Sequence, residues 1–88
     1  MNTSTEALRQ LQQALTSARE AAQVINDLIV EHEYQDVAAL VTQAAASLLE
    51  SAALLMQLQD EPALAALEQA DDLLDEVYGI IDGETDDE

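Results

Sequence analysis

Apolar residues recur at alternating spacings of three and four along residues 3–31 of the 88-residue chain. This spacing is typical of an amphipathic helix, because residues three and four apart lie on one helix face. Thr3 followed by Glu6 matches a capping box, a sequence signature of a helix start. The pattern predicts a first helix over residues 3–31, with an inward stripe of Leu8, Leu11, Leu15, Ala18, Ala22, Ile25 and Ile29.

A polar segment over residues 31–36 interrupts this pattern. It contains neither Gly nor Pro, so the break is inferred from its polarity and from Asp36 as a helix N-cap. The alternative is one helix that continues through the segment and makes a hairpin of a very long and a short helix. With the break, the second helix is predicted over residues 36–59.

The second predicted helix is apolar over most of its circumference, and Glu50 is the single charge within residues 37–59. Such a helix is usually buried on several sides. We read one inward stripe, widened by further apolar residues, and we expect a second packing surface for a dimer or a partner helix. The alternative is a plain Ala-rich central helix. The stripe comprises Val37, Val41, Ala44, Leu48, Ala52, Leu55 and Leu58, and the self-association candidates are Leu40, Leu48, Leu49, Leu55 and Met56.

Asp60-Glu61-Pro62 is the clearest break in the chain, since proline suits the first turn of a helix and acidic residues there favour its dipole. A third helix is predicted over residues 62–82, with Gly83 as its C-terminal cap. Residues 83–88 are expected to form a disordered acidic tail. Three helices with short connections predict an all-α domain over residues 1–82, an antiparallel three-helix bundle that self-associates into a dimer.

Composition supports helices and restricts the chemistry. Hydrophobic residues make up 49% of the chain, the only aromatic residues are Tyr34 and Tyr78, and cysteine is absent, which excludes disulfides and thiolate metal sites. No signal peptide is visible at the N-terminus, and residues 37–59 contain too many polar side chains for a typical membrane span. We therefore expect a cytoplasmic protein without a membrane segment.

The net charge is −17, and Arg9 and Arg19 are the only Lys or Arg residues. Two arginines are too few for direct binding of nucleic acid, which requires several cationic contacts. Residues 60–88 hold 12 of the 19 acidic residues and no base. The predicted third helix carries an acidic face opposite its apolar stripe, which points to a basic protein partner, to mimicry of the DNA phosphate array, or to solubility alone. This acidic face consists of Glu68, Asp71, Asp72, Asp75 and Glu76.

Catalytic and metal-binding chemistry has little support in the sequence. The chain has one histidine, no cysteine and no Gly-rich phosphate loop, and carboxylate pairs such as Asp71 and Asp75 lack an evident buried pocket that would shift a pKa. His32 lies between two glutamates, but adjacent residues point in different directions. The Asp82-x-Glu84-x-Asp86 spacing lacks the later residues of a calcium loop. We expect no enzyme activity, no cofactor and no metal.

These features predict a small acidic helical interaction or adaptor protein. It would bind a protein partner through an apolar helix groove and through the acidic face. One alternative is a DNA-mimic inhibitor of a nucleic-acid-binding protein. The other is a structural building block of an oligomer.

Overall fold

The computed structural model describes residues 3–29 and 34–86. Three α-helices make up these residues: α1 (Ser4–Asn26), α2 (Gln35–Met56) and α3 (Asp60–Asp86). No strand occurs among them. The prediction of an all-α, three-helix fold is therefore confirmed.

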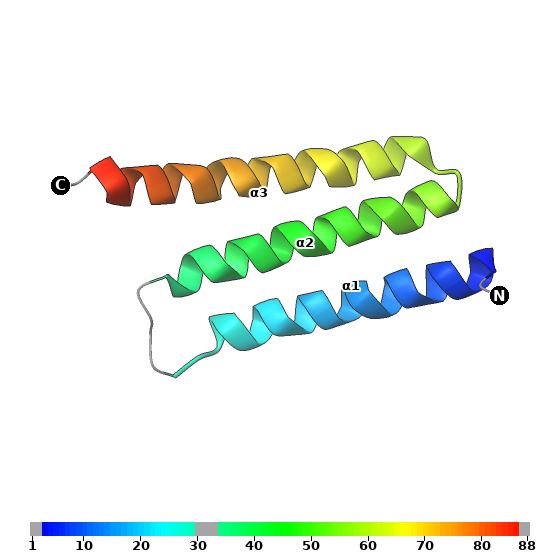
Figure 1. Ribbon diagram of the computed structural model, residues 1–88, viewed down its shortest axis with the longest axis horizontal. Helices are drawn as coiled ribbons and strands as arrows, with labels where there is room; N and C mark the ends of the chain where they lie inside the picture. The colour runs from blue at the N-terminus through cyan, green and yellow to red at the C-terminus, as the bar shows by residue number, and fades with distance from the viewer. Residues whose placement is uncertain (1–2, 30–33, 87–88) are drawn as a thin grey trace.

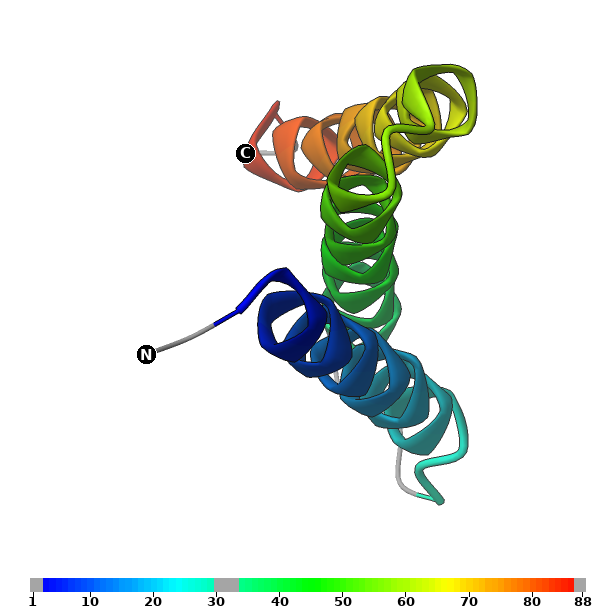
Figure 2. The same ribbon diagram turned by 90° about the vertical axis from the view of Figure 1, so that its right-hand side faces the viewer.

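The helix α2 is the centre of the molecule. It packs against α1 on one side and against α3 on the other, whereas the described backbones of α1 and α3 do not approach each other. Figure 1 shows α2 between the other two helices, and the end-on view in Figure 2 shows the three as a twisted stack. The molecule measures 51 × 27 × 20 Å. Because the bundle is open, α2 is accessible from two opposite sides of the stack.

The start of α1 follows the predicted capping signal in part. The Glu6 backbone N–H donates to the Thr3 hydroxyl oxygen at 3.2 Å. The Glu6 carboxylate accepts from Arg9 at 2.7 Å and from Gln10 at 3.1 Å. Arg9, and to a smaller extent Gln10, lowers the pKa of Glu6 because both stabilise the charged carboxylate.

The end of α1 comes earlier than predicted. The helix stops at Asn26, and the Asp27 N–H closes it by donating to the Gln23 carbonyl at 3.0 Å. Ile29, placed in the inward stripe by the sequence pattern, is 98% exposed. Asn and Asp are poor helix formers, which accounts for the early stop. The two helices are separate elements, since α2 begins only at Gln35, and residues 30–33, including His32, lie outside the described part of the chain.

The turn between α2 and α3 comes earlier in the chain than predicted. α2 ends at Met56, and Leu58 has a positive φ of 60°. The N–H groups of Leu58 and Gln59 donate to the carbonyls of Leu55 and Leu54, both at 3.0 Å, which is the Schellman pattern of a helix C-terminus. Leu58 is 91% exposed, so the prediction that it belongs to the inward stripe is wrong.

α3 is longer than predicted at both ends, because it begins at Asp60 and continues to Asp86. Pro62 lies in its first turn, as expected from the missing N–H of proline. Gly83 lies within the helix without a positive φ, so it is not the left-handed cap that the sequence suggested. Residues 83–86 of the expected acidic tail therefore belong to α3, and residues 87 and 88 lie outside the described chain.

The core is built from small residues, mostly alanine. On α2 six of the seven buried residues form two rows with a spacing of seven on opposite sides of the helix, and the seventh, Ser47, belongs to neither row. The first row lies on the side of α1, where Arg19 meets Glu50 and the Gln35 side chain donates to the Ile25 carbonyl. The second row faces α3. The rows are Ala39, Ala46 and Ala53, and Val37, Ala44 and Ser51.

These two rows replace the single stripe that the sequence predicted for this helix. Val41, Leu48 and Leu55 of that stripe are 45%, 45% and 51% exposed. A helix with neighbours on two opposite sides buries two rows, and small side chains allow both neighbours to approach closely. Large apolar side chains therefore lie at the margins of the helix contacts, and within the described chain none of them is fully buried.

By length and composition alone, α2 also resembles a membrane span, with a mean hydropathy of 1.5 over its most apolar window. The polar side chains within residues 37–59 argue against that role. The resemblance is weak evidence, because the central helix of a soluble protein meets the same criteria. In this structure α2 buries two rows of side chains against its two neighbouring helices.

Candidate interaction surfaces

The five residues of the acidic face are all exposed on α3. The side of α3 that faces α2 contains the buried Ala63, Ala66, Ala70 and Val77, and the acidic face lies away from it. The described chain contains two ion pairs, Arg9 with Glu6 and Arg19 with Glu50, and neither involves α3. The five carboxylates of the acidic face thus present their charge to solvent, and no ion pair within the described chain involves them.

The predicted self-association residues do not all lie on one surface. Leu48, Leu55 and Met56 are 45%, 51% and 44% exposed on the same side of α2. Leu49 is half-buried. Leu40 is also half-buried and lines a small pocket with Glu76 and Ile80 on the other side of the stack.

The exposed side of α2 carries a regular apolar row that we call the α2 seam. Its members alternate between alanine and a larger residue at spacings of three and four, which is the a/d pattern of a packing helix. The sequence pattern placed four of these six residues in the inward stripe of the predicted helix, whereas the residues that are buried form the two rows of small side chains at spacing seven. The α2 seam consists of Ala38, Val41, Ala45, Leu48, Ala52 and Leu55; Ala52 is half-buried and the others are exposed.

Apolar residues of α3 and α1 continue the α2 seam on both sides. Leu55 of the seam, Leu64 and Leu67 line one open pocket of about 290 Å³, so the seam is continuous with α3. Helix periodicity places Ala7, Ala14 and Ala21 of α1 on the same side of the stack. We call the α2 seam with these flanks the apolar side.

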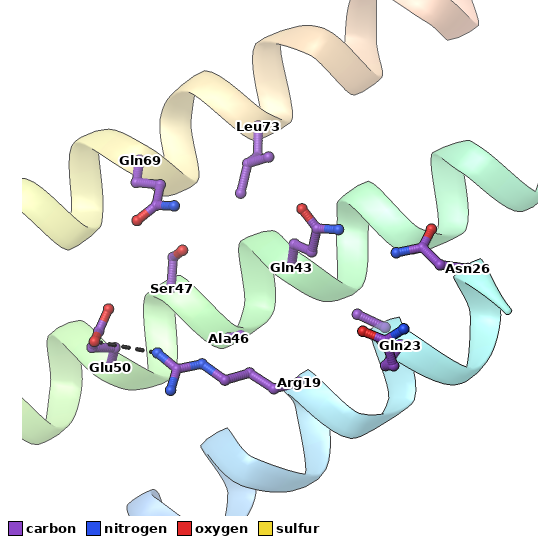
Figure 3. A pocket seen from close by; sticks show the side chains of 10 residues that line it. Arg19, Gln23, Asn26, Gln43, Ala46, Ser47, Glu50, Gln69 and Leu73 are labelled. Atoms are coloured by element: carbon purple, nitrogen blue, oxygen red, sulfur yellow. Dashed lines mark hydrogen bonds and ion pairs between the residues drawn. The ribbon is translucent and has the colours of Figure 1, made fainter.

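The opposite side of the stack is a polar groove. It has a volume of about 260 Å³, its floor is α2, and its walls come from α1 and α3. Figure 3 shows the Arg19 side chain reaching from α1 to the Glu50 carboxylate, at 3.3 Å, beside Ser47 and several amide side chains. Its amides and hydroxyl offer hydrogen bonds, but its one carboxylate is paired with an arginine. No nucleophile activated by a neighbouring base lines this groove.

The described residues contain no group of three His, Asp or Glu side chains that is able to hold a metal ion. Glu31, His32 and Glu33 lie outside these residues, and so do the side chains of Glu84 and Asp86. The chain matches no known family model, no curated protein and no solved structure.

Proposed function

We propose that this chain is a non-catalytic interaction protein that self-associates through its apolar side and presents the acidic face of α3 to a basic protein partner. The observation that carries this proposal is the α2 seam, a regular apolar row left uncovered on the central helix. Regular a/d rows normally mark a helix surface that packs against another helix.

The surface area of the single chain supports self-association. The chain exposes 6302 Å², whereas a compact monomer of its mass exposes about 5,000 Å². The radius of gyration is 15.3 Å, compared with about 12 Å for a compact domain of this length. The excess area exceeds the ~800 Å² that each partner loses in an interface of standard size.

The thin core supports the same proposal. The buried residues are mainly alanines, while Val41, Leu48 and Leu55 remain about half exposed. Burying a Leu side chain completely stabilises a fold by roughly 1.5–3 kcal/mol, so covering the α2 seam would contribute more hydrophobic stabilisation than covering an alanine row. In a dimer the seams of both copies would be buried.

The acidic face supports the proposal of a basic partner, because clustered carboxylates attract and orient a cationic surface. If the basic partner is a nucleic-acid-binding protein, the same contact is DNA mimicry. If there is no basic partner, the protein is a structural building block. A cytoplasmic location remains a prediction from the sequence.

The α2 seam is tested by introducing charge into it. We expect the double substitution Leu48→Glu and Leu55→Glu to convert a dimer into a monomer, because four carboxylates would have to be buried in the interface. The mass in solution, measured by light scattering at several protein concentrations, reports the change. The matched control is Gln12→Glu with Gln69→Glu, which adds the same charge at exposed positions away from the apolar side. A wild-type chain that is monomeric at every concentration contradicts self-association.

A further inference from the structure

We infer that the second copy packs on the apolar side about a two-fold axis parallel to α2, so that α1 of each copy lies over α3 of the other. This inference rests on the self-association proposed above and adds the orientation of the two chains. The occupant of the apolar side is thus a second copy of this chain.

Two orientations satisfy two-fold symmetry when the same side of two stacks meets face to face. With the axis along α2, the two α2 helices run parallel and each α1 covers the partner's α3. With the axis across α2, the two α2 helices run antiparallel, α1 meets α1 and α3 meets α3. The flanks of the apolar side therefore distinguish the two orientations.

Charge on the flanks favours the axis along α2. α1 contains two glutamates and two arginines, a net charge of zero, whereas α3 contains ten carboxylates and no base. Pairing α3 with α3 would oppose the two most acidic elements of the dimer, and juxtaposed like charges strongly disfavour a complex. Pairing α1 with α3 keeps the acidic helices apart.

Asp71 places a negative charge on the apolar side itself. On the apolar side, α3 continues the a/d spacing through Leu67, Asp71, Leu74 and Tyr78, so an exposed carboxylate lies in the middle of the row. The pockets that place Leu55 beside Leu64 and Leu40 beside Ile80 put the middle of α2 level with this part of α3. An axis across α2 would therefore bring the two Asp71 carboxylates together near the axis.

Side-chain size favours the same orientation. The α1 flank presents mostly small residues, Ala7, Ala14, Ser17 and Ala21, with Gln10 towards one end and Val24, which is 63% exposed, at the other. The α3 flank presents larger ones, such as Leu64 and Tyr78, which are 57% and 60% exposed. Large side chains pack well against a row of small ones, whereas pairing like flanks would separate one pair of helices and leave gaps at the other.

The α2 seam alone offers each orientation one favourable feature, and by side-chain size it favours the antiparallel pair. In a parallel pair, Leu48 meets its own counterpart, as Leu does at the d position of parallel coiled coils. In an antiparallel pair, each alanine of the seam would face a larger residue. The flanks distinguish the two orientations, because the α1 flank and the α3 flank differ in both charge and side-chain size.

Cross-linking of single-cysteine variants tests the orientation, since the natural chain has no cysteine. Ala45→Cys lies near the middle of α2 and should cross-link in either orientation, so it reports self-association alone. Ala38→Cys should cross-link only when the α2 helices are parallel, because an antiparallel pair places the two residues about 25 Å apart along the helix axis. Ala21→Cys on α1 should cross-link only when α1 meets α1. All three positions are exposed.

The full-length variants are treated with a bis-maleimide shorter than these separations and resolved on a denaturing gel, after circular dichroism has confirmed the helical fold. We expect Ala45→Cys and Ala38→Cys to move to a band of twice the monomer mass and Ala21→Cys to stay monomeric. Cross-linking of Ala45→Cys and Ala21→Cys without Ala38→Cys overturns the orientation and leaves self-association intact. A monomer in light scattering with no cross-link at any position overturns self-association itself. A dimer that cross-links at none of the three positions overturns the orientation.

Discussion

Leu58 occupies a turn position whose left-handed backbone conformation is unfavourable for a residue with a side chain. Its φ of 60° closes the turn between α2 and α3, and its side chain is 91% exposed. The left-handed conformation costs a residue with a Cβ atom roughly 1–2 kcal/mol, whereas glycine adopts it freely. Both the backbone and the side chain of Leu58 are therefore unfavourable at this position.

We expect Leu58→Gly to raise the free energy of unfolding by about 1 kcal/mol, because the relief of the strained φ outweighs the greater freedom of glycine in the unfolded chain. Chemical denaturation at one fixed protein concentration measures the change. Leu58→Ala is the matched control, since it removes the exposed apolar side chain and keeps the Cβ atom. Equal stability of the Gly and Ala variants would contradict the role of the backbone.

At the scale of the helix, burial is decided by how closely a neighbour approaches. Ala70 of α3 is 0% exposed and faces α2, whereas Ala65 of the same helix is exposed. Both residues have the same helix propensity and the same small side chain. The difference in their exposure therefore comes from the position of the neighbouring helix α2.

We expect Ala70→Leu to lower the free energy of unfolding by about 1–3 kcal/mol, because the larger side chain would force α2 and α3 apart. Ala65→Leu is the matched control and should change stability by less than about 0.5 kcal/mol. Thermal and chemical denaturation followed by circular dichroism compare the two variants. A tolerated Leu at position 70 would show that α2 and α3 are not closely packed there.

At the scale of the whole molecule, the two proposed surfaces depend on salt in opposite directions. Each copy has a net charge of −17, so two copies repel each other and screening by salt favours the dimer. A basic partner is attracted by the same charge, so salt weakens that complex. Salt dependence therefore separates self-association from partner binding.

Neutralising part of the acidic face tests the basic partner. We expect the variant Asp72→Asn, Asp75→Asn and Glu76→Gln, which leaves Asp71 on the apolar side unchanged, to bind a basic protein captured by the wild type from a host extract about tenfold more weakly or worse at low salt. The same variant should form its dimer at least as well as the wild type in light scattering. Glu20→Gln, an exposed substitution on α1, should leave the capture unchanged. Equal capture by the neutralised variant, or capture that is insensitive to salt, would exclude the acidic face as the binding surface.

The interior of each helix and much of the acidic face were predictable from local patterns. Apolar spacings of three and four, Thr3 as a cap and Pro62 as a first-turn residue identify three helices without knowledge of the fold. The ends were less predictable. α1 stops at Asn26 although its apolar spacing runs on to Ile29, α2 ends in a Schellman turn that has Leu58 in place of the usual glycine, and α3 continues through Gly83.

Helix periodicity, charge and composition are properties of the chain alone, so they identify this protein as helical, acidic and poor in groups for catalysis before its fold is known. Which apolar residues are core and which are surface follows instead from the arrangement of the helices. Ala46 is buried while Leu48, two residues away, is 45% exposed, although Leu is the more hydrophobic residue. The reason is that burial depends on where α1 and α3 lie around α2. Two opposite neighbours bury two rows of small residues and leave the larger row uncovered.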